Sequence, residues 1–168
     1  GHIAVDGEAT FGNGTVVEAI NEGGGREILI YDHLSAQLAY IQSLYRHRKD
    51  LIAHLKEMIH AYTNSVKSDM GTIGDHVEIL NCRSIKDVNI GSYAKLEGVV
   101  SLQNGSLNSY KDAPIYIGSE VMAENFIISS DTIVDNATLL TNCFVGQGCT
   151  LDKHYSAEHS VFFANSQG

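Results

Sequence analysis

The sequence predicts a mainly β protein: a single-stranded parallel β-helix of about six triangular coils, interrupted by an inserted helical hairpin. The first observation is a recurring dipeptide, an aliphatic residue followed by Gly or Asp, which opens at Ile73, Ile90, Ile117, Val134 and Leu151. Successive openings are seventeen positions apart, except that Ile90 and Ile117 are separated by twenty-seven. A fixed period of this kind is typical of a solenoid, in which each repeat buries its apolar face on the next.

Further apolar columns keep the same period. One contains Cys82, Val99, Phe126 and Cys143, and another contains Ile79, Leu96, Ala123 and Leu140. A further column starts with Ile85 and Leu102 and slips by one residue after the insertion, to Ile128 and Val145. Three inward columns per coil predict three short sides. The single longer step predicts an insertion of ten positions, which we place between Leu107 and Ile117. Loops that leave a regular scaffold often carry function.

Within each coil an aliphatic residue leads and a small or β-branched one follows four later, as in Ile73-Gly74-Asp75-His76-Val77-Glu78 and Val145-Gly146-Gln147-Gly148-Cys149-Thr150. On these residues, the stretch from about 71 to 168 resembles the hexapeptide-repeat superfamily. The resemblance implies a left-handed β-helix and a homo-oligomer, with a trimer favoured. The chain also looks similar to a segment of an uncharacterised family of long bacterial hexapeptide-repeat proteins.

Three parts follow in order along the chain. Residues 1–31 are predicted to form an N-terminal coil, because Phe11-Gly12-Asn13 and Val17 can be aligned with the first regular repeat. Residues 32–68 carry apolar residues at helical steps of three and four, which predicts an inserted helical hairpin. One straight helix would carry the chain about 50 Å, so we expect two antiparallel helices with a break near 47–50 and Asp50 as N-cap. Residues 69–168 form the main β-helix, with a loop insertion near 108–116.

Composition narrows the function classes. A net charge of −9 with only 11 Lys and Arg argues against nucleic-acid binding. No run approaches the roughly 20 apolar residues of a membrane span, and we expect a cytoplasmic protein. Cys82, Cys143 and Cys149 fall on inward or small-residue positions and are expected to pack as small hydrophobes. Neither the cysteines nor the histidines have the close spacing of a metal site, so no metal is expected.

The resemblance also implies a chemistry. Many members of the superfamily are acyltransferases that move an acyl group from coenzyme A or an acyl carrier to a sugar or amine, with histidine as general base. In the UDP-N-acetylglucosamine acyltransferase branch this histidine opens a stretch of the form His-Asp-Cys-Thr-Val-Gly. Three stretches of this chain match that form, but Lys86, Ser130 and Thr141 stand in place of the histidine. We therefore expect no bound cofactor and no activity of this chain alone.

One histidine remains a candidate base. His154 lies close in sequence to Asp152, and a nearby carboxylate can orient an imidazole; the alternative is an exposed turn residue. Candidate substrate- or cofactor-binding residues are Tyr110, Lys111, Asn142 and Lys153. The favoured function is a segment of a transferase-like protein acting on a sugar or sugar nucleotide. The alternative is a non-catalytic β-helix that binds a regulatory ligand or holds subunits together, and the sequence does not decide between them.

Overall fold

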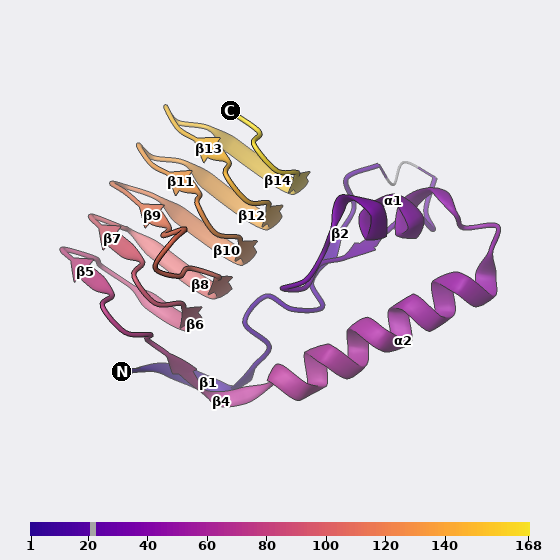
Figure 1. Cartoon of the computed structure of the whole chain (residues 1–168), viewed down its shortest axis with the longest axis horizontal. Coiled ribbons are helices and arrows are strands. Elements are labelled where there is room, and N and C mark those ends of the chain that lie inside the picture. Colours follow the sequence, from indigo (N-terminus) through magenta and orange to yellow (C-terminus); the bar gives the residue numbers. More distant parts are fainter. Residues whose placement is uncertain (21–22) are drawn as a thin grey trace.

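The computed structural model describes residues 1–20 and 23–168, and its C-terminal part consists of stacked parallel coils (Figure 1). Five strands form the first sheet: β6 (Ile85–Ile90), β8 (Ser101–Leu107), β10 (Met122–Ile128), β12 (Leu139–Val145) and β14 (Ser156–Phe162). Five shorter strands form the second: β5 (Glu78–Leu80), β7 (Lys95–Glu97), β9 (Tyr116–Ile117), β11 (Ile133–Val134) and β13 (Thr150–Leu151). Because the chain alternates between the two sheets, it forms a β-solenoid of about five turns. The predicted mainly β, parallel fold is confirmed.

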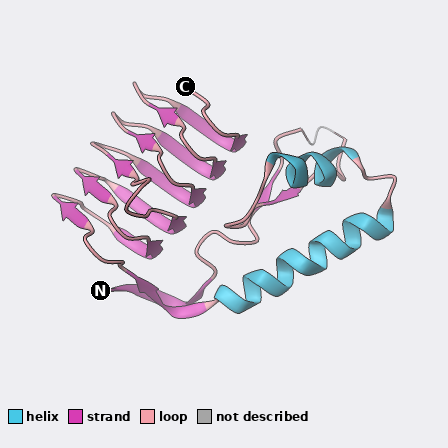
Figure 2. Ribbon diagram, in the orientation of Figure 1, coloured by secondary structure: helices cyan, strands magenta, loops and turns pink. Residues whose placement is uncertain are grey.

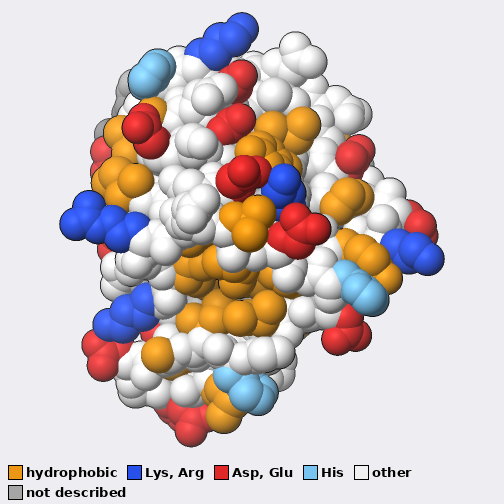
Figure 3. All heavy atoms as spheres, turned by 90° about the vertical axis from the view of Figure 1, so that its left-hand side faces the viewer, with side chains coloured by type: hydrophobic (Ala, Val, Ile, Leu, Met, Phe, Trp, Pro, Cys, Tyr) orange, Lys and Arg blue, Asp and Glu red, His pale blue; other side chains and the backbone are white. Residues whose placement is uncertain are grey.

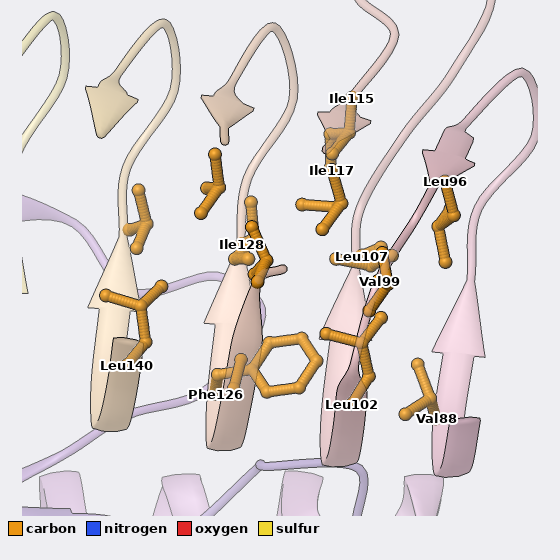
Figure 4. Close-up of a cluster of buried hydrophobic side chains, with 14 of the residues drawn as sticks. Val88, Leu96, Val99, Leu102, Leu107, Ile115, Ile117, Phe126, Ile128 and Leu140 are labelled. Carbon is orange, nitrogen blue, oxygen red and sulfur yellow. The ribbon is translucent and has the colours of Figure 1, made fainter. Parts of the chain in front are cut away.

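Inward side chains of successive coils stack into one apolar core (Figure 4). Leu102, Phe126 and Ile128 are fully buried, and Leu140 is almost fully buried. Burial of such a side chain stabilises the fold by roughly 1.5–3 kcal/mol. The predicted packing of cysteines is confirmed for Cys143, which lies in this core with no exposed surface.

The register across the predicted insertion differs from the prediction. Leu96 pairs with Ile117, and Leu102 pairs with Ala123, so each of these steps is twenty-one positions long. The loop near 108–116 therefore adds four positions to the regular coil of seventeen, and the predicted ten is wrong. The predicted step compared two different corners, because Ile90 ends β6 whereas Ile117 ends β9.

The N-terminal coil predicted for residues 1–31 is also wrong. Strand β1 (His2–Ala9) pairs antiparallel with β4 (Ser68–Thr72), and β2 (Val16–Val17) pairs antiparallel with β3 (Ile28–Leu29). The chain leaves along β1, forms the helical region and returns along β4, which explains the antiparallel pairing (Figure 1). The β1–β4 ribbon lies beside β6 and covers the first coil, which protects a strand edge. Residues 21 and 22 of the predicted coil lie outside the described residues.

Two helices follow β3 (Figure 2). Helix α1 (Ala36–Leu44) begins after Ser35, whose Oγ accepts a hydrogen bond from the Leu38 N–H at 3.2 Å. Helix α2 (Lys49–Val66) begins after Arg48, so the predicted break is confirmed near 45–48, and Asp50 lies in the first turn instead of capping it. Among the described residues, no helix has the length and apolar character needed to cross a membrane.

Residues 10–20 and 23–66, here called the lobe, pack against one side of the solenoid. Ile127 of β10 and Phe144 of β12 point out of the coils into an apolar cluster with Ile30 and Ile59 of the lobe. All four side chains are at most 4% exposed. This contact fixes where the lobe meets the corners of the coils.

Candidate functional site

A cleft of about 700 Å³ lies between the lobe and the corners of the solenoid. The lobe contributes residues 32–37 and Tyr62, which bring together the end of the β3 segment, the start of α1 and the last turns of α2. The solenoid contributes Asn108 and Tyr110 from the inserted loop, and residues from the equivalent corners of the next coils. This volume is within the range of small-molecule sites, roughly 300–1,000 Å³. We call it the interlobe cleft.

Asp32 ties the two walls of the interlobe cleft together. Its Oδ2 accepts a hydrogen bond from Tyr62 Oη at 2.8 Å, and its Oδ1 accepts one from Asn108 Nδ2 at 3.0 Å. Its backbone N–H donates to Asn13 Oδ1 at 2.9 Å. Partial burial, together with the hydrogen bond to Asp32, raises the pKa of Tyr62, so this phenol stays a hydrogen-bond donor even at alkaline pH. The network holds the polar groups in place before any ligand enters.

Aromatic and hydroxyl groups complete the lining. The exposed ring of His33 lies edge-on to Tyr62, with centroids 5.2 Å apart. Across the cleft, Tyr110 Oη and Ser130 Oγ share a hydrogen bond of 2.9 Å, and Tyr110 remains 53% exposed. Neither Lys nor Arg lines the cleft within the described residues, and no cluster of three potential metal ligands occurs there. The cleft therefore offers hydroxyl, amide, carboxylate and aromatic contacts without positive charge.

Only one of the predicted site residues lines this cleft. Tyr110 does, whereas its neighbour Lys111 is exposed on the loop. Lys153 and His154 are exposed at the corner after β13, and the His154 N–H donates to the Asn136 carbonyl at 2.8 Å. The structure thus places Tyr110 and His154 at different corners of the coil.

The carboxylate next to His154 has other partners. Asp152 Oδ1 accepts a hydrogen bond from Asn136 Nδ2 at 2.7 Å and one from the Lys153 N–H at 2.6 Å. These bonds, with the Asn136 amide the larger cause, hold the pKa of Asp152 below its ordinary value. The structure provides no hydrogen bond between this carboxylate and the His154 ring within the described residues.

Asn142 belongs to a ladder of polar side chains on the lobe-facing sheet. Asn104 donates to Asn125 at 2.8 Å, Asn125 donates to Asn142 at 2.9 Å, and Asn142 lies 3.2 Å from Nε2 of His159. The lobe closes both ends, because the Gly12 N–H donates to Asn104 Oδ1 and the Glu18 N–H donates to His159 Nδ1. The Asn142 amide therefore already has hydrogen-bond partners on both neighbouring coils.

Sequence reasoning missed the other residues of the interlobe cleft, among them Asp32, His33 and Tyr62. Asp32 and His33 directly follow a short apolar strand, where polar side chains often reach a site, but nothing local connects them with Asn108. A signal did exist for the ladder, since Asn125, Asn142 and His159 recur at the regular step of the coils.

The fold and the cleft define a class: a parallel β-solenoid with a docked helical lobe and a polar, uncharged-to-acidic cleft between them. Residues 1–168 match the family described as "Domain of unknown function (DUF4954)", and the chain belongs to that family. The chain is 30% identical, over 112 residues, to a Treponema pallidum (strain Nichols) protein described as "Uncharacterized protein". The match covers 67% of this chain and 16% of that protein. No solved structure matches the chain.

Proposed function

We propose that the chain is a sugar-binding segment of a transferase-like protein, and that the interlobe cleft is the sugar site. The observation that carries the proposal is the chemistry of the lining: Asp32, Asn108 and the hydroxyls of Tyr110 and Ser130 surround a cleft with aromatic walls. Sugar hydroxyls need donors and acceptors fixed in space, and sugar C–H faces pack on aromatic rings. Because no Lys or Arg is among the described residues of the lining, the cleft suits an uncharged sugar better than a phosphate.

Resemblance to hexapeptide-repeat transferases supports a group-transfer role. In such a reaction a histidine removes the proton from the acceptor hydroxyl. His33 lines the interlobe cleft, whereas His154 does not, so the geometry favours His33 as the base if this chain contributes one. An acyl donor such as coenzyme A or an acyl carrier, and a cytoplasmic location, are parts of the same proposal.

The proposal is tested by ligand-induced stabilisation of the chain. Glucose, N-acetylglucosamine and UDP-N-acetylglucosamine are titrated while the melting temperature is followed. A ligand at 100 times its dissociation constant raises the free energy of unfolding by about 2.7 kcal/mol. We expect stabilisation by a sugar that Tyr110→Ala abolishes and that the matched corner variant His154→Ala retains. If His154→Ala abolished the stabilisation and Tyr110→Ala retained it, the sugar site would lie at the corner of His154 instead. If none of the three ligands raised the melting temperature, sugar binding would be refuted.

A second candidate, self-association, is favoured by apolar side chains that face solvent. Met122 and Leu139 are paired on neighbouring coils and are 43% and 41% exposed, and Ile133 is 45% exposed. Hydrophobic side chains gather across the middle of the face drawn in Figure 3. We propose that such a face joins copies of the chain, with a homo-trimer favoured by the resemblance. Light scattering tests this: a trimer that Leu139→Glu dissociates supports it, and a monomer at high concentration refutes it.

A further inference from the structure

A second hollow, of about 600 Å³, lies at the junction between α1 and α2. Its lining includes Arg46, His47, Lys49, Lys56, Gly24 and Gly25. It shares no lining residue with the interlobe cleft and has the opposite character, because cations dominate it. We call it the basic hollow.

The concentration of positive charge here is unusual for this chain. Four of the 11 Lys and Arg residues, namely Arg46, Arg48, Lys49 and Lys56, fall within eleven consecutive positions of a protein with a net charge of −9. None of these four forms an ion pair with any residue that the structure describes, whereas Lys67, Lys86 and Lys95 all do. Mutual repulsion of unpaired cations is unfavourable unless an anion offsets it.

Three of these cations, Arg46, Lys49 and Lys56, line the basic hollow, whereas Arg48 does not. Lys49 and Lys56 are seven positions apart on α2, with Ile52 and Ala53 between them on the same face, so both ammonium groups border one depression. The opposite wall is the glycine turn, where a ligand can approach the backbone closely because no side chain intervenes. The turn already binds one anionic oxygen, because the Gly25 N–H donates a hydrogen bond to Glu27 Oε1 at 3.1 Å.

An apolar region adjoins the basic hollow. Tyr45, next to Arg46 in sequence, lines a further hollow of about 500 Å³ together with Tyr40 and Ile41. The Tyr45 ring stacks on the His47 imidazole, with centroids 5.6 Å apart and an interplanar angle of 29°. A planar base or another aromatic group can stack on such a platform while its phosphates reach the cations.

We propose that the basic hollow binds the phosphates of an organic diphosphate, in particular a nucleoside diphosphate whose base packs near Tyr45. The volume exceeds what a bare phosphate ion needs, and the aromatic platform accounts for an organic part. This site is separate from the proposed sugar cleft, and its existence does not depend on that proposal.

The test is isothermal titration of the whole chain, at fixed ionic strength, with ADP, inorganic pyrophosphate and a short DNA duplex. Charge-assisted hydrogen bonds are worth about 1.5–3 kcal/mol, so Lys49→Gln/Lys56→Gln should weaken ADP and pyrophosphate binding at least about tenfold. The control Lys67→Gln/Arg83→Gln removes the same charge elsewhere and should change affinity less than about twofold. Equal losses in the two double variants, no binding of ADP, or binding of DNA alone would each overturn the proposal.

A further variant tests the organic part of the ligand. Tyr45→Ala should weaken ADP binding while leaving pyrophosphate binding unchanged, because pyrophosphate has no base to stack. Equal affinity of the unmodified chain for ADP and pyrophosphate would refute the nucleoside part. Melting curves of all variants provide the folding control, since Lys49, Tyr45 and Lys56 lie at the surface or are only half-buried.

Discussion

Gly105→Ala should destabilise the solenoid because of a single aromatic ring. Gly105 of β8 pairs with Phe126 of β10, and a Cβ added to Gly105 would lie 2.5 Å from Phe126 Cε2, with other ring atoms closer still. Phe126 has no exposed surface, so its ring has little freedom to move away. Overpacking of this kind costs about 1–3 kcal/mol of unfolding free energy.

The pair can be tested by a double-mutant cycle measured in urea by circular dichroism. Phe126→Leu alone should destabilise the chain by leaving a cavity. In the double variant Gly105→Ala/Phe126→Leu, the new methyl group enters the space that the ring has left. We therefore expect the double variant to be more stable than the sum of the two single effects, by about 0.5–3 kcal/mol.

Gly23→Ala is the matched control. A Cβ at Gly23 has nothing within 4 Å, and its backbone φ is not in the left-handed region, so this change should be close to neutral. Additive effects of Gly105→Ala and Phe126→Leu, or a Gly105→Ala variant as stable as Gly23→Ala, would refute the observed register across the inserted loop.

Three other substitutions test the core, the ladder and the response to acid. Ile90→Asp places an unpaired charge in the core and should unfold the chain, whereas Tyr110→Phe should leave the melting temperature within a few degrees; equal shifts would contradict the coil assignment. Asn125→Ala removes two hydrogen bonds and puts alanine at φ 52°, so we expect a loss of about 1–3 kcal/mol in urea, partly restored by Asn125→Gly. The Lys86 ammonium, 2.7 Å away, lowers the pKa of Asp6, so the ion pair stabilises the fold above the ordinary carboxyl pKa and is lost as pH falls through the lowered one. Asp6→Asn should therefore flatten the fall in melting temperature below about pH 5, and parallel curves for the two proteins would contradict this.

The sequence predicted the coils well wherever the regular period is unbroken. Phe126 and Cys143 were expected in one column, and they pair in the structure. The prediction failed across the inserted loop, because both corners of a coil carry an aliphatic residue followed by a small one. Ile90 pairs with Leu107, which is followed by Asn108 and therefore lacks the recurring dipeptide, whereas Ile117-Gly118 has it.

The interlobe cleft could not be predicted from spacing, because its residues come from three distant segments. Asp32, Tyr62 and Asn108 meet only when the lobe packs on the solenoid, and the apolar contacts that decide this packing lie elsewhere. Position along the chain gives no indication of which side of the coils the lobe covers. Tyr110 was a candidate because it lies in the inserted loop, and in the structure it lines the interlobe cleft.

The docked lobe also limits how copies of the chain can associate. Flat sides of triangular coils are the usual contact surfaces in oligomers of the resembled superfamily, but here one side is already covered. Ile127 and Phe144 point outward from that side and are buried by the lobe, so a second copy cannot reach them while the lobe is in place. A trimer would have to use surface that the lobe leaves exposed, which includes Met122 and Leu139. The lobe and the solenoid of one chain both contribute residues to the lining of the interlobe cleft.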